Sequence, residues 1–349
     1  MKKVRWGVIG AGGIADRRTI PGMKKAENAE LISVMEINQE FAERLKLKWN
    51  AKRAYDNEID LLNDPEIDAV YISSPVISHA QQAIAAADRG KHILIEKPIA
   101  LTAKEAEKIV KYCDQKGIMI AAGFMMRFGS YVQEMKKAIA AGKIGKVVSG
   151  YGQFTCWYPD MEGNWRQQKK TSGGGALMDM GVHCIDLMQY VTGSKVCRVA
   201  AFNDTLTFNY EVEDSSTLIL QLENGAQCIV QSNFNIPDQA SKWRLEFFGD
   251  EGRLVGNNVI GQVDGGNLDA LFCGKSGAYD PIQNTQEIEG EEIKVEFGDL
   301  YTREIISFGD SVLNGKPLEA PASEAVYIQE IIEAAYISNE QNKIINIDE

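Results

Sequence analysis

Short apolar runs alternate with amphipathic segments along the first third of the chain. The apolar runs have the length and composition of buried strands and occupy residues 3–10, 31–35, 68–73, 92–95 and 118–122. Segments with helical spacing lie between them, over residues 14–26, 39–49, 78–89 and 102–115. The last segment opens with a capping box, Thr102 followed by Glu105. Strands and helices in this alternation predict a parallel, doubly wound sheet.

The pattern changes after residue 123. One further helix is predicted over 131–141, and strands then dominate, over 147–155, 196–208, 215–223, 226–235 and 243–249. Tight turns at Asn224-Gly225 and at Gly249–Gly252 predict antiparallel hairpins. Further helices are predicted over 175–192, 301–314 and 323–341, whereas residues 256–298 carry no clear pattern. We therefore predict an α/β protein with a doubly wound domain over 1–123 and an α+β domain, mostly antiparallel, over 124–349.

Composition narrows the classes of partner. The length of 349 residues suits two domains, and the net charge of −12 (37 basic against 49 acidic residues) disfavours a phosphate backbone as partner. No apolar run reaches the roughly 18 residues of a membrane-spanning helix. The N-terminal apolar stretch is short, broken by glycine and soon followed by Asp16, so we expect a cytoplasmic protein without a signal peptide. The six cysteines form no C-x-x-C pair, and we expect reduced thiols.

A glycine-rich turn follows the first predicted strand. The turn is Gly10-Ala11-Gly12-Gly13-Ile14-Ala15, which fits the G-x-G-x-x-A pattern of a dinucleotide-binding βαβ unit. Glu36 ends the second predicted strand, where a carboxylate would accept hydrogen bonds from a ribose diol and repel a 2′-phosphate. The turn therefore predicts a dinucleotide cofactor, NAD rather than NADP. A plain glycine turn with a surface glutamate is the structural alternative.

Two more candidate turns follow predicted strands. Glu96-Lys97-Pro98 comes directly after the strand at 92–95, and Ser74-Pro75 after the strand at 68–73. Ligands of open α/β sheets bind at the carboxyl ends of strands, so Lys97 is a candidate donor to a substrate hydroxyl. It would otherwise be a solvated lysine. His79 could face the nicotinamide side of a cofactor, and His92 is expected to pack in the core.

The third candidate histidine lies in the second half of the chain. Asp179 and His183 follow Gly173-Gly174-Gly175 and are four residues apart, so one helical face would carry both. A carboxylate beside an imidazole suits a general base near neutral pH. A buried pair that only stabilises the helix is the alternative. No H-E-x-x-H or His/Cys cluster is present, so we expect no catalytic metal.

Taken together, these motifs resemble the Gfo/Idh/MocA family of oxidoreductases. The resemblance rests on Gly10-x-Gly12-x-x-Ala15, Glu36, Ser74-Pro75, Glu96-Lys97-Pro98 and the segment Gly173-Gly174-Gly175 with Asp179, His183 and Asp186. It is clear from about residue 3 to 195 and fainter beyond. It implies an N-terminal Rossmann domain and a C-terminal domain whose large open sheet supports homodimers or homotetramers.

The resemblance also implies roles for individual residues. Lys97 would bind the reacting hydroxyl, and His183 would take its proton while a hydride passes to C4 of the nicotinamide; which of the two is the base stays open. Asp179 would orient His183 and touch the substrate. Substrate selection would fall to Arg127 and to the loop between residues 155 and 173, with Trp157, Tyr158, Trp165 and Arg166. Those aromatic side chains would otherwise pin a loop or an oligomer contact.

Three functions agree with this pattern. The first is an NAD-dependent dehydrogenase of a sugar, polyol (inositol-like) or glycoside, which oxidises a secondary ring hydroxyl. The second cleaves a glycoside or epimerises a sugar through a transient keto-sugar, with no net redox change. The third is a non-enzymatic NAD-binding sensor, which would have no need to retain Lys97, Asp179 and His183 together.

Overall fold

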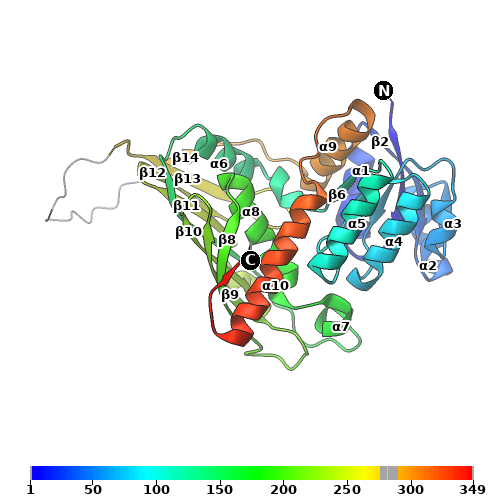
Figure 1. The fold of residues 1–349 in the computed structure, drawn as a ribbon. Helices are drawn as coiled ribbons and strands as arrows, with labels where there is room; N and C mark the ends of the chain where they lie inside the picture. Colours follow the sequence, from blue (N-terminus) through cyan, green and yellow to red (C-terminus); the bar gives the residue numbers. More distant parts are fainter. Residues whose placement is uncertain (1, 276–280, 282–289, 348–349) are drawn as a thin grey trace. The chain divides into compact units, whose positions relative to one another are not determined.

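The computed structural model describes residues 2–275, 281 and 290–347, and Figure 1 draws its helices and strands. The chain forms two compact units. The first unit comprises Met1–Met125, Met161–Asp179 and Asp299–Glu333, and the second comprises Met126–Asp160, Met180–Gly298 and Ala334–Glu349. The leading segment of the first unit therefore ends near the predicted division at residue 123, and two later segments return to that unit. The domain limits 1–123 and 124–349 stay a prediction.

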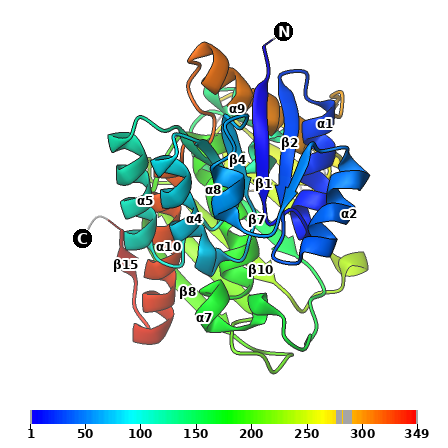
Figure 2. The ribbon, with the colours of Figure 1, turned by 90° about the vertical axis from the view of Figure 1, so that its right-hand side faces the viewer.

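The first unit is built on a six-stranded, wholly parallel sheet. In spatial order its strands are β3 (Arg53–Tyr55), β2 (Ala29–Met35), β1 (Val4–Ile9), β4 (Ala69–Ile72), β5 (His92–Ile95) and β6 (Ile120–Ala122). Its helical segments are a π-helical turn (Ala15–Thr19), α1 (Ile20–Lys25), α2 (Gln39–Trp49), α3 (Glu58–Leu62), α4 (Val76–Asp88), α5 (Ala103–Gln115), α7 (Lys169–Ser172), α9 (Leu300–Asn314) and most of α10 (Ala322–Gln341). Figure 2 shows α1 and α2 on one side of β1 and β2, and α4 and α5 on the other. The prediction of a doubly wound parallel sheet is confirmed.

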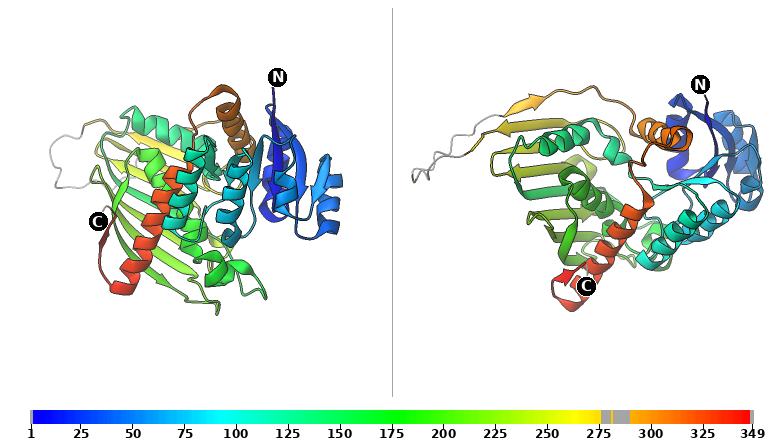
Figure 3. Two further views of the ribbon diagram at one scale, coloured as in Figure 1. Left: turned by 45° about the vertical axis from the view of Figure 1, so that its right-hand side comes forward. Right: turned by 45° about the horizontal axis from the view of Figure 1, so that its top comes forward.

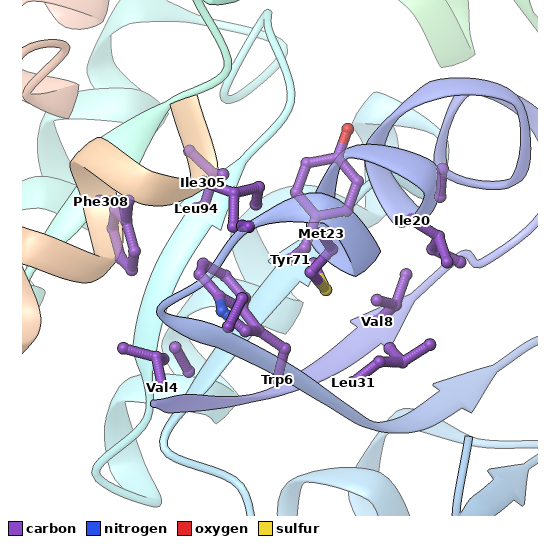
Figure 4. Close-up of a cluster of buried hydrophobic side chains, with 14 of the residues drawn as sticks. Val4, Trp6, Val8, Ile20, Met23, Leu31, Tyr71, Leu94, Ile305 and Phe308 are labelled. Carbon is purple, nitrogen blue, oxygen red and sulfur yellow. The ribbon is translucent and has the colours of Figure 1, made fainter. Parts of the chain in front are cut away.

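Alternate residues of β1 face α1 and α9. Val4, Trp6 and Val8 are fully buried and join Met23 of α1 and Phe308 of α9 in one apolar cluster (Figure 4). The centroids of the Trp6 and Phe308 rings lie 5.2 Å apart. Burial of each such large side chain contributes roughly 1.5–3 kcal/mol. This packing fixes β1 and therefore the position of the glycine-rich turn that follows it.

The strand order reverses between β1 and β4, which are neighbours in the sheet. Gly10 follows β1 and Ser74 follows β4, so both lie at the carboxyl edge where the order changes direction. Open α/β sheets bind their ligands at this kind of switch point. The fold thus brings two of the predicted cofactor turns to one place.

The second unit is built on a nine-stranded sheet. In spatial order its strands are β14 (Glu291–Ile293), β13 (Asn267–Phe272), β12 (Gly252–Asn257), β11 (Arg244–Gly249), β7 (Val147–Thr155), β10 (Gln227–Asn233), β9 (Ser215–Leu222), β8 (Val196–Asp204) and β15 (Ile345–Asn346). All neighbours are antiparallel except β7 and β10, which are parallel. Two helices, α6 (Ser130–Ala140) and α8 (Val182–Thr192), belong to this unit, and Figure 3 shows them against one face of the sheet. The predicted large, mostly antiparallel sheet is confirmed.

Two glycines of β7 let α8 lie close to the sheet. A Cβ on Gly150 would lie 3.0 Å from Met188 Sδ, and a Cβ on Gly152 would lie 2.9 Å from Met188 Cε and 3.2 Å from Cys184 Cβ. A side chain at either position would require Met188 to move, and at position 152 it would also crowd Cys184 of α8. Because His183 is on α8, these two glycines help to set its position.

Several short elements escape the sequence pattern. The structure adds β3, α3, α7 and β15, each of five residues or fewer, and it places β13 and β14 in the stretch 256–298 that carried no pattern. The strand predicted over 196–208 ends at Asp204. Within the described residues, no helix combines the length and apolar character that crossing a membrane requires.

Candidate active site

The predicted site residues fall in both compact units. The first unit holds Gly10, Gly12, Gly13, Ile14, Ala15, Glu36, Ser74, Pro75, His79, Glu96, Lys97, Trp165, Arg166 and Asp179, and the second holds Arg127, Trp157, Tyr158 and His183. Each group is described within its own unit.

The glycine-rich turn packs against the turn after β4. Gly10 has a φ of +74°, and a Cβ there would lie 2.7 Å from the backbone nitrogen of Ser74. Only glycine suits this conformation and this close approach. Ser73 Oγ also donates to the carbonyl of Gly10 at 2.9 Å. The two turns therefore form one rigid edge.

Glu36 is tied to the same turn. Its Oε1 accepts a hydrogen bond from the Gly12 amide at 2.6 Å, and a Cβ on Gly12 would lie 2.9 Å from that oxygen. At Gly13, a Cβ would meet nothing within 4 Å, so the backbone here is open to a ligand. A bare backbone turn with a carboxylate at its edge fits the pyrophosphate and ribose of a dinucleotide.

Lys97 is held by Asp179, 82 positions further along the chain. Its Nζ donates to the backbone carbonyl of Asp179 at 2.7 Å and to Oδ1 at 2.9 Å. The lysine side chain is only 12% exposed, whereas the Asp179 side chain is 36% exposed. An ammonium group has three N–H donors. Two serve Asp179, and the third can meet a substrate oxygen.

Ser74 and His79 both have hydrogen-bond partners within the first unit. Ser74 Oγ donates to Gln82 of α4, and Pro75 precedes the first residue of that helix. His79 is buried, with Nδ1 3.0 Å from the Pro98 carbonyl oxygen and Nε2 2.8 Å from the Ser74 carbonyl oxygen. Burial lowers the pKa of His79 to about 4, although both carbonyl contacts favour the charged form. A direct contact of this ring with a cofactor would require one of the carbonyl contacts to be given up.

Trp165 and Arg166 lie in the same unit as Lys97. The Arg166 guanidinium carbon lies 4.4 Å from the centroid of the Trp165 ring. Burial raises the pKa of Glu96, and the charge of Arg166 is one of the smaller effects that oppose this shift. The predicted selectivity loop therefore brings a cation toward the Glu96-Lys97 turn.

His183 lies in the second unit, on the first turn of α8. Its ring is buried and packs edge-on against Phe154, with 6.2 Å between the ring centroids. Phe154 in turn packs edge-on against Trp243, with 5.9 Å between the centroids. A π-helical turn, Leu177–Gly181, precedes α8, and the limit between the two units falls directly after Asp179. The predicted Asp179–His183 contact stays a prediction.

Arg127 has a partner that the sequence motif already contained. Its Nε donates to both carboxylate oxygens of Asp186, at 3.0 and 3.1 Å, and both side chains are buried. Its guanidinium also lies 4.8 Å from the Tyr190 ring centroid. The ion pair links the segment before α6 to α8, so the observed role is structural. Substrate contact by Arg127 stays a prediction.

Trp157 and Tyr158 are pinned at the end of β7. The Trp157 amide donates to Asp238 at 3.0 Å and its ring packs on Phe208 at 5.1 Å, yet 46% of the residue is exposed. Tyr158 packs on Phe234 at 5.0 Å. These contacts agree with the loop-pinning alternative and leave the Trp157 surface accessible.

Sequence reasoning missed the polar groups behind the Glu96-Lys97 turn. Tyr71, Thr19 and Glu304 are all buried there, as part of strands and helices with ordinary apolar patterns. No local motif marks them, because their contacts join segments far apart in sequence. Among the described residues, no group of three or more His, Cys, Asp or Glu side chains could hold a metal ion.

The fold and these turns define a Rossmann-type oxidoreductase. The family description "Oxidoreductase family, NAD-binding Rossmann fold" matches residues 4–124, and "GFO/IDH/MocA C-terminal domain" matches residues 132–255. The chain belongs to the GFO/IDH/MocA family, as its motifs predict.

Named relatives act on carbohydrates. The chain is 29% identical to 1,5-anhydro-D-fructose reductase of Ensifer adhaerens over 76% of its length and 79% of the relative. It is 27% identical to D-xylose 1-dehydrogenase (NADP(+)) 2 of Haloferax volcanii, over 98% of this chain and 99% of the relative. A solved levoglucosan dehydrogenase, in complex with NADH and levoglucosan, has the same fold, with a TM-score of 0.86, 24% identity and coverage of 100% of both chains.

Proposed function

We propose that this protein is an NAD-dependent oxidoreductase that transfers a hydride between nicotinamide and a secondary ring hydroxyl of a sugar, polyol or glycoside. The Lys97–Asp179 pair carries the proposal, because it occupies the carboxyl edge of the sheet that also holds the glycine-rich turn. The names of the relatives support the substrate class.

Each residue of the proposed site has a distinct task. Lys97 holds the substrate hydroxyl oxygen with the N–H group that does not serve Asp179. His183, four residues beyond Asp179, takes the hydroxyl proton, and Asp179 orients it. The cofactor, when bound, supplies the hydride acceptor at C4 of its nicotinamide ring. In the reverse direction His183 returns the proton to the carbonyl oxygen.

We favour NAD over NADP as the cofactor. The support is the Glu36 carboxylate, which the Gly12 amide holds at the glycine-rich turn. A negative charge at this position repels a 2′-phosphate. One relative is named for NADP(+), so the preference rests on this residue.

We assign substrate selection to Arg166 and Trp157, and with them to Trp165, Tyr158 and Arg127. Trp157 has an exposed ring face on which a sugar can stack. Arg166 has its guanidinium on Trp165 and its charge near Glu96.

We also propose that two or more copies associate through the large sheet. The face away from α8 carries exposed Ile219 and Ile229, which are paired on β9 and β10, and exposed Phe202 on β8. Apolar side chains grouped on an open sheet face are typical of an interface between subunits.

The proposal is tested with purified protein, NAD⁺ and a panel of inositols, hexoses, amino sugars and glycosides. We expect NADH to accumulate with at least one compound. Lys97→Met should lower kcat by roughly 10²–10⁴-fold while the Kd for NADH changes little, and Lys104→Met, an exposed lysine of the same unit, should match the wild type.

Two other results of this experiment would favour the alternative functions. Cleavage of a glycoside or epimerisation of a sugar without NADH accumulation would favour transient oxidation. Full function after loss of Lys97 and His183 would favour a sensor.

A further inference from the structure

A chain of hydrogen bonds runs from the core to the turn that carries Lys97. Thr19 Oγ1 donates to the Tyr71 hydroxyl at 2.9 Å, and the Tyr71 hydroxyl donates to Glu96 Oε1 in a short hydrogen bond. Thr19 ends the π-helical turn after the glycine-rich turn, and Tyr71 lies on β4. Both are fully buried. The proposed reaction assigns neither of them a task.

The single proton of the Tyr71 hydroxyl decides which group donates and which accepts in these two hydrogen bonds. A phenol has one proton to donate. Because Thr19 donates to the Tyr71 oxygen, the Tyr71 proton is directed to Glu96. Successive hydrogen bonds polarise one another, so the carboxylate receives a stronger donor than an isolated phenol.

Burial and the surrounding groups act on Glu96 in opposite directions. Burial raises the pKa of Glu96, and Lys97, the Tyr71 hydrogen bond and Arg166 lower it. Two residues of α9, Glu304 and Tyr301, lie close to Glu96. Burial raises the pKa of both groups, and the negative charge of Glu96 raises it further. Burial thus disfavours the ionised form of all three groups, and Glu96 is the member of this cluster that accepts the Tyr71 hydrogen bond.

We propose that Tyr71, oriented by Thr19, is a positioning residue that stabilises the ionised form of Glu96 and thereby favours binding of NAD⁺ over NADH. The inference rests on the proposed function, and it takes Glu96 to lie near the bound nicotinamide because Glu96 directly follows β5 and precedes Lys97 at the carboxyl edge of the sheet. The oxidised nicotinamide ring carries a positive charge and the reduced ring carries none. A carboxylate near the ring therefore lowers the Kd for NAD⁺ relative to that for NADH.

The ratio of the two dissociation constants, Kd(NAD⁺)/Kd(NADH), reports the charge of Glu96 and requires no substrate. A merely structural role of Tyr71 would weaken binding of both forms and leave the ratio unchanged. The ratio is measured by titration calorimetry at about pH 6 and about pH 8 on the full chain, because protonation of a carboxyl whose pKa is raised by burial is favoured at the lower pH.

Tyr71→Phe keeps the ring and removes the hydroxyl. It should raise the pKa of Glu96, so that the carboxylate takes up a proton as the pH falls. We expect the ratio to rise by roughly 3–10-fold at the lower pH and less at the higher pH, since one pKa unit corresponds to a tenfold change. Thr19→Val should shift the ratio in the same direction by a smaller factor, and Glu96→Gln should raise it at both pH values.

Two variants serve as matched controls. Tyr301→Phe removes a hydroxyl from another buried tyrosine near Glu96, and Glu304→Gln replaces another buried carboxyl group near Glu96 by an amide of the same size. Both should leave the ratio within twofold of the wild type.

The outcomes separate the inference from the proposed function. A ratio that rises in Glu96→Gln but stays constant in both Tyr71→Phe and Thr19→Val would overturn the inference alone. A shift of equal size in Tyr301→Phe would also overturn it, because general loosening would then explain the result. Wild-type protein that binds neither NAD⁺ nor NADH would overturn the proposed function and the inference together.

Discussion

Lys97 gains its proposed role from a residue 82 positions away. Its own turn can be located in the sequence, because it follows a short apolar strand. The backbone carbonyl of Asp179, which accepts one of its hydrogen bonds, cannot be located in that manner. At this scale the sequence indicates which side chains carry the chemistry, and the fold decides which atoms they meet.

Glu36 offers a test of cofactor choice at the residue scale. Glu36→Gln keeps an acceptor for the Gly12 amide and removes the negative charge. We expect the Kd for NADPH to fall by roughly tenfold relative to that for NADH, because the repulsion of a 2′-phosphate is lost. Fluorescence titration of both cofactors measures the change, and Glu40→Gln on α2 is the control. An unchanged ratio would remove Glu36 from the basis of NAD selection.

At the element scale, β7 sets the position of α8. Gly150 and Gly152 have no side chain, so the helix packs directly on the strand. The Arg127–Asp186 ion pair ties the same helix to the segment before α6. His183 is therefore held by packing against β7 and by a buried charge pair, of which only Asp186 belongs to the motif that identified it.

Gly152→Ala tests this packing. The new methyl group would lie 2.9 Å from Met188 Cε and 3.2 Å from Cys184 Cβ. Overpacking of this kind costs about 1–3 kcal/mol of unfolding free energy, which chemical denaturation measures. Ser149→Ala, an exposed position of the same strand, should change the unfolding free energy by less than about 0.5 kcal/mol. Equal stability of the two variants would show that α8 does not depend on this contact.

At the scale of the whole molecule, local signals predicted more than distant pairings did. Each strand–helix repeat of the first unit has its own hydrophobic pattern, so the doubly wound sheet was predictable. Strand β3 has three residues and α3 has five, which is too short for a period to appear. The parallel pairing of β7 with β10, and the return of residues 161–179 and 299–333 to the first unit, depend on packing between distant segments. The buried Thr19–Tyr71–Glu96 chain was missed for the same reason.

The exposed apolar side chains on the open face of the large sheet predict that copies of the chain associate through this face. Ile219→Asp combined with Ile229→Asp places two charges on paired, exposed positions. We expect the double variant to sediment as a smaller species than the wild type, because charges disfavour a buried apolar interface. Leu47→Asp, an exposed position on α2, should leave the mass unchanged. Wild-type protein that is already monomeric would contradict association through this face.

Single-turnover reduction of bound NAD⁺ tests the central claim most directly. Enzyme in excess over NAD⁺ is mixed with each carbohydrate of the panel, and NADH absorbance is followed on the stopped-flow timescale. The method detects hydride transfer even if the hydride later returns to the product. We expect a rise in NADH absorbance with at least one sugar, polyol or glycoside in the wild type, and a rise slowed by roughly 10²-fold or more in Lys97→Met. Bound NAD⁺ that stays oxidised with every compound of the panel would contradict the account.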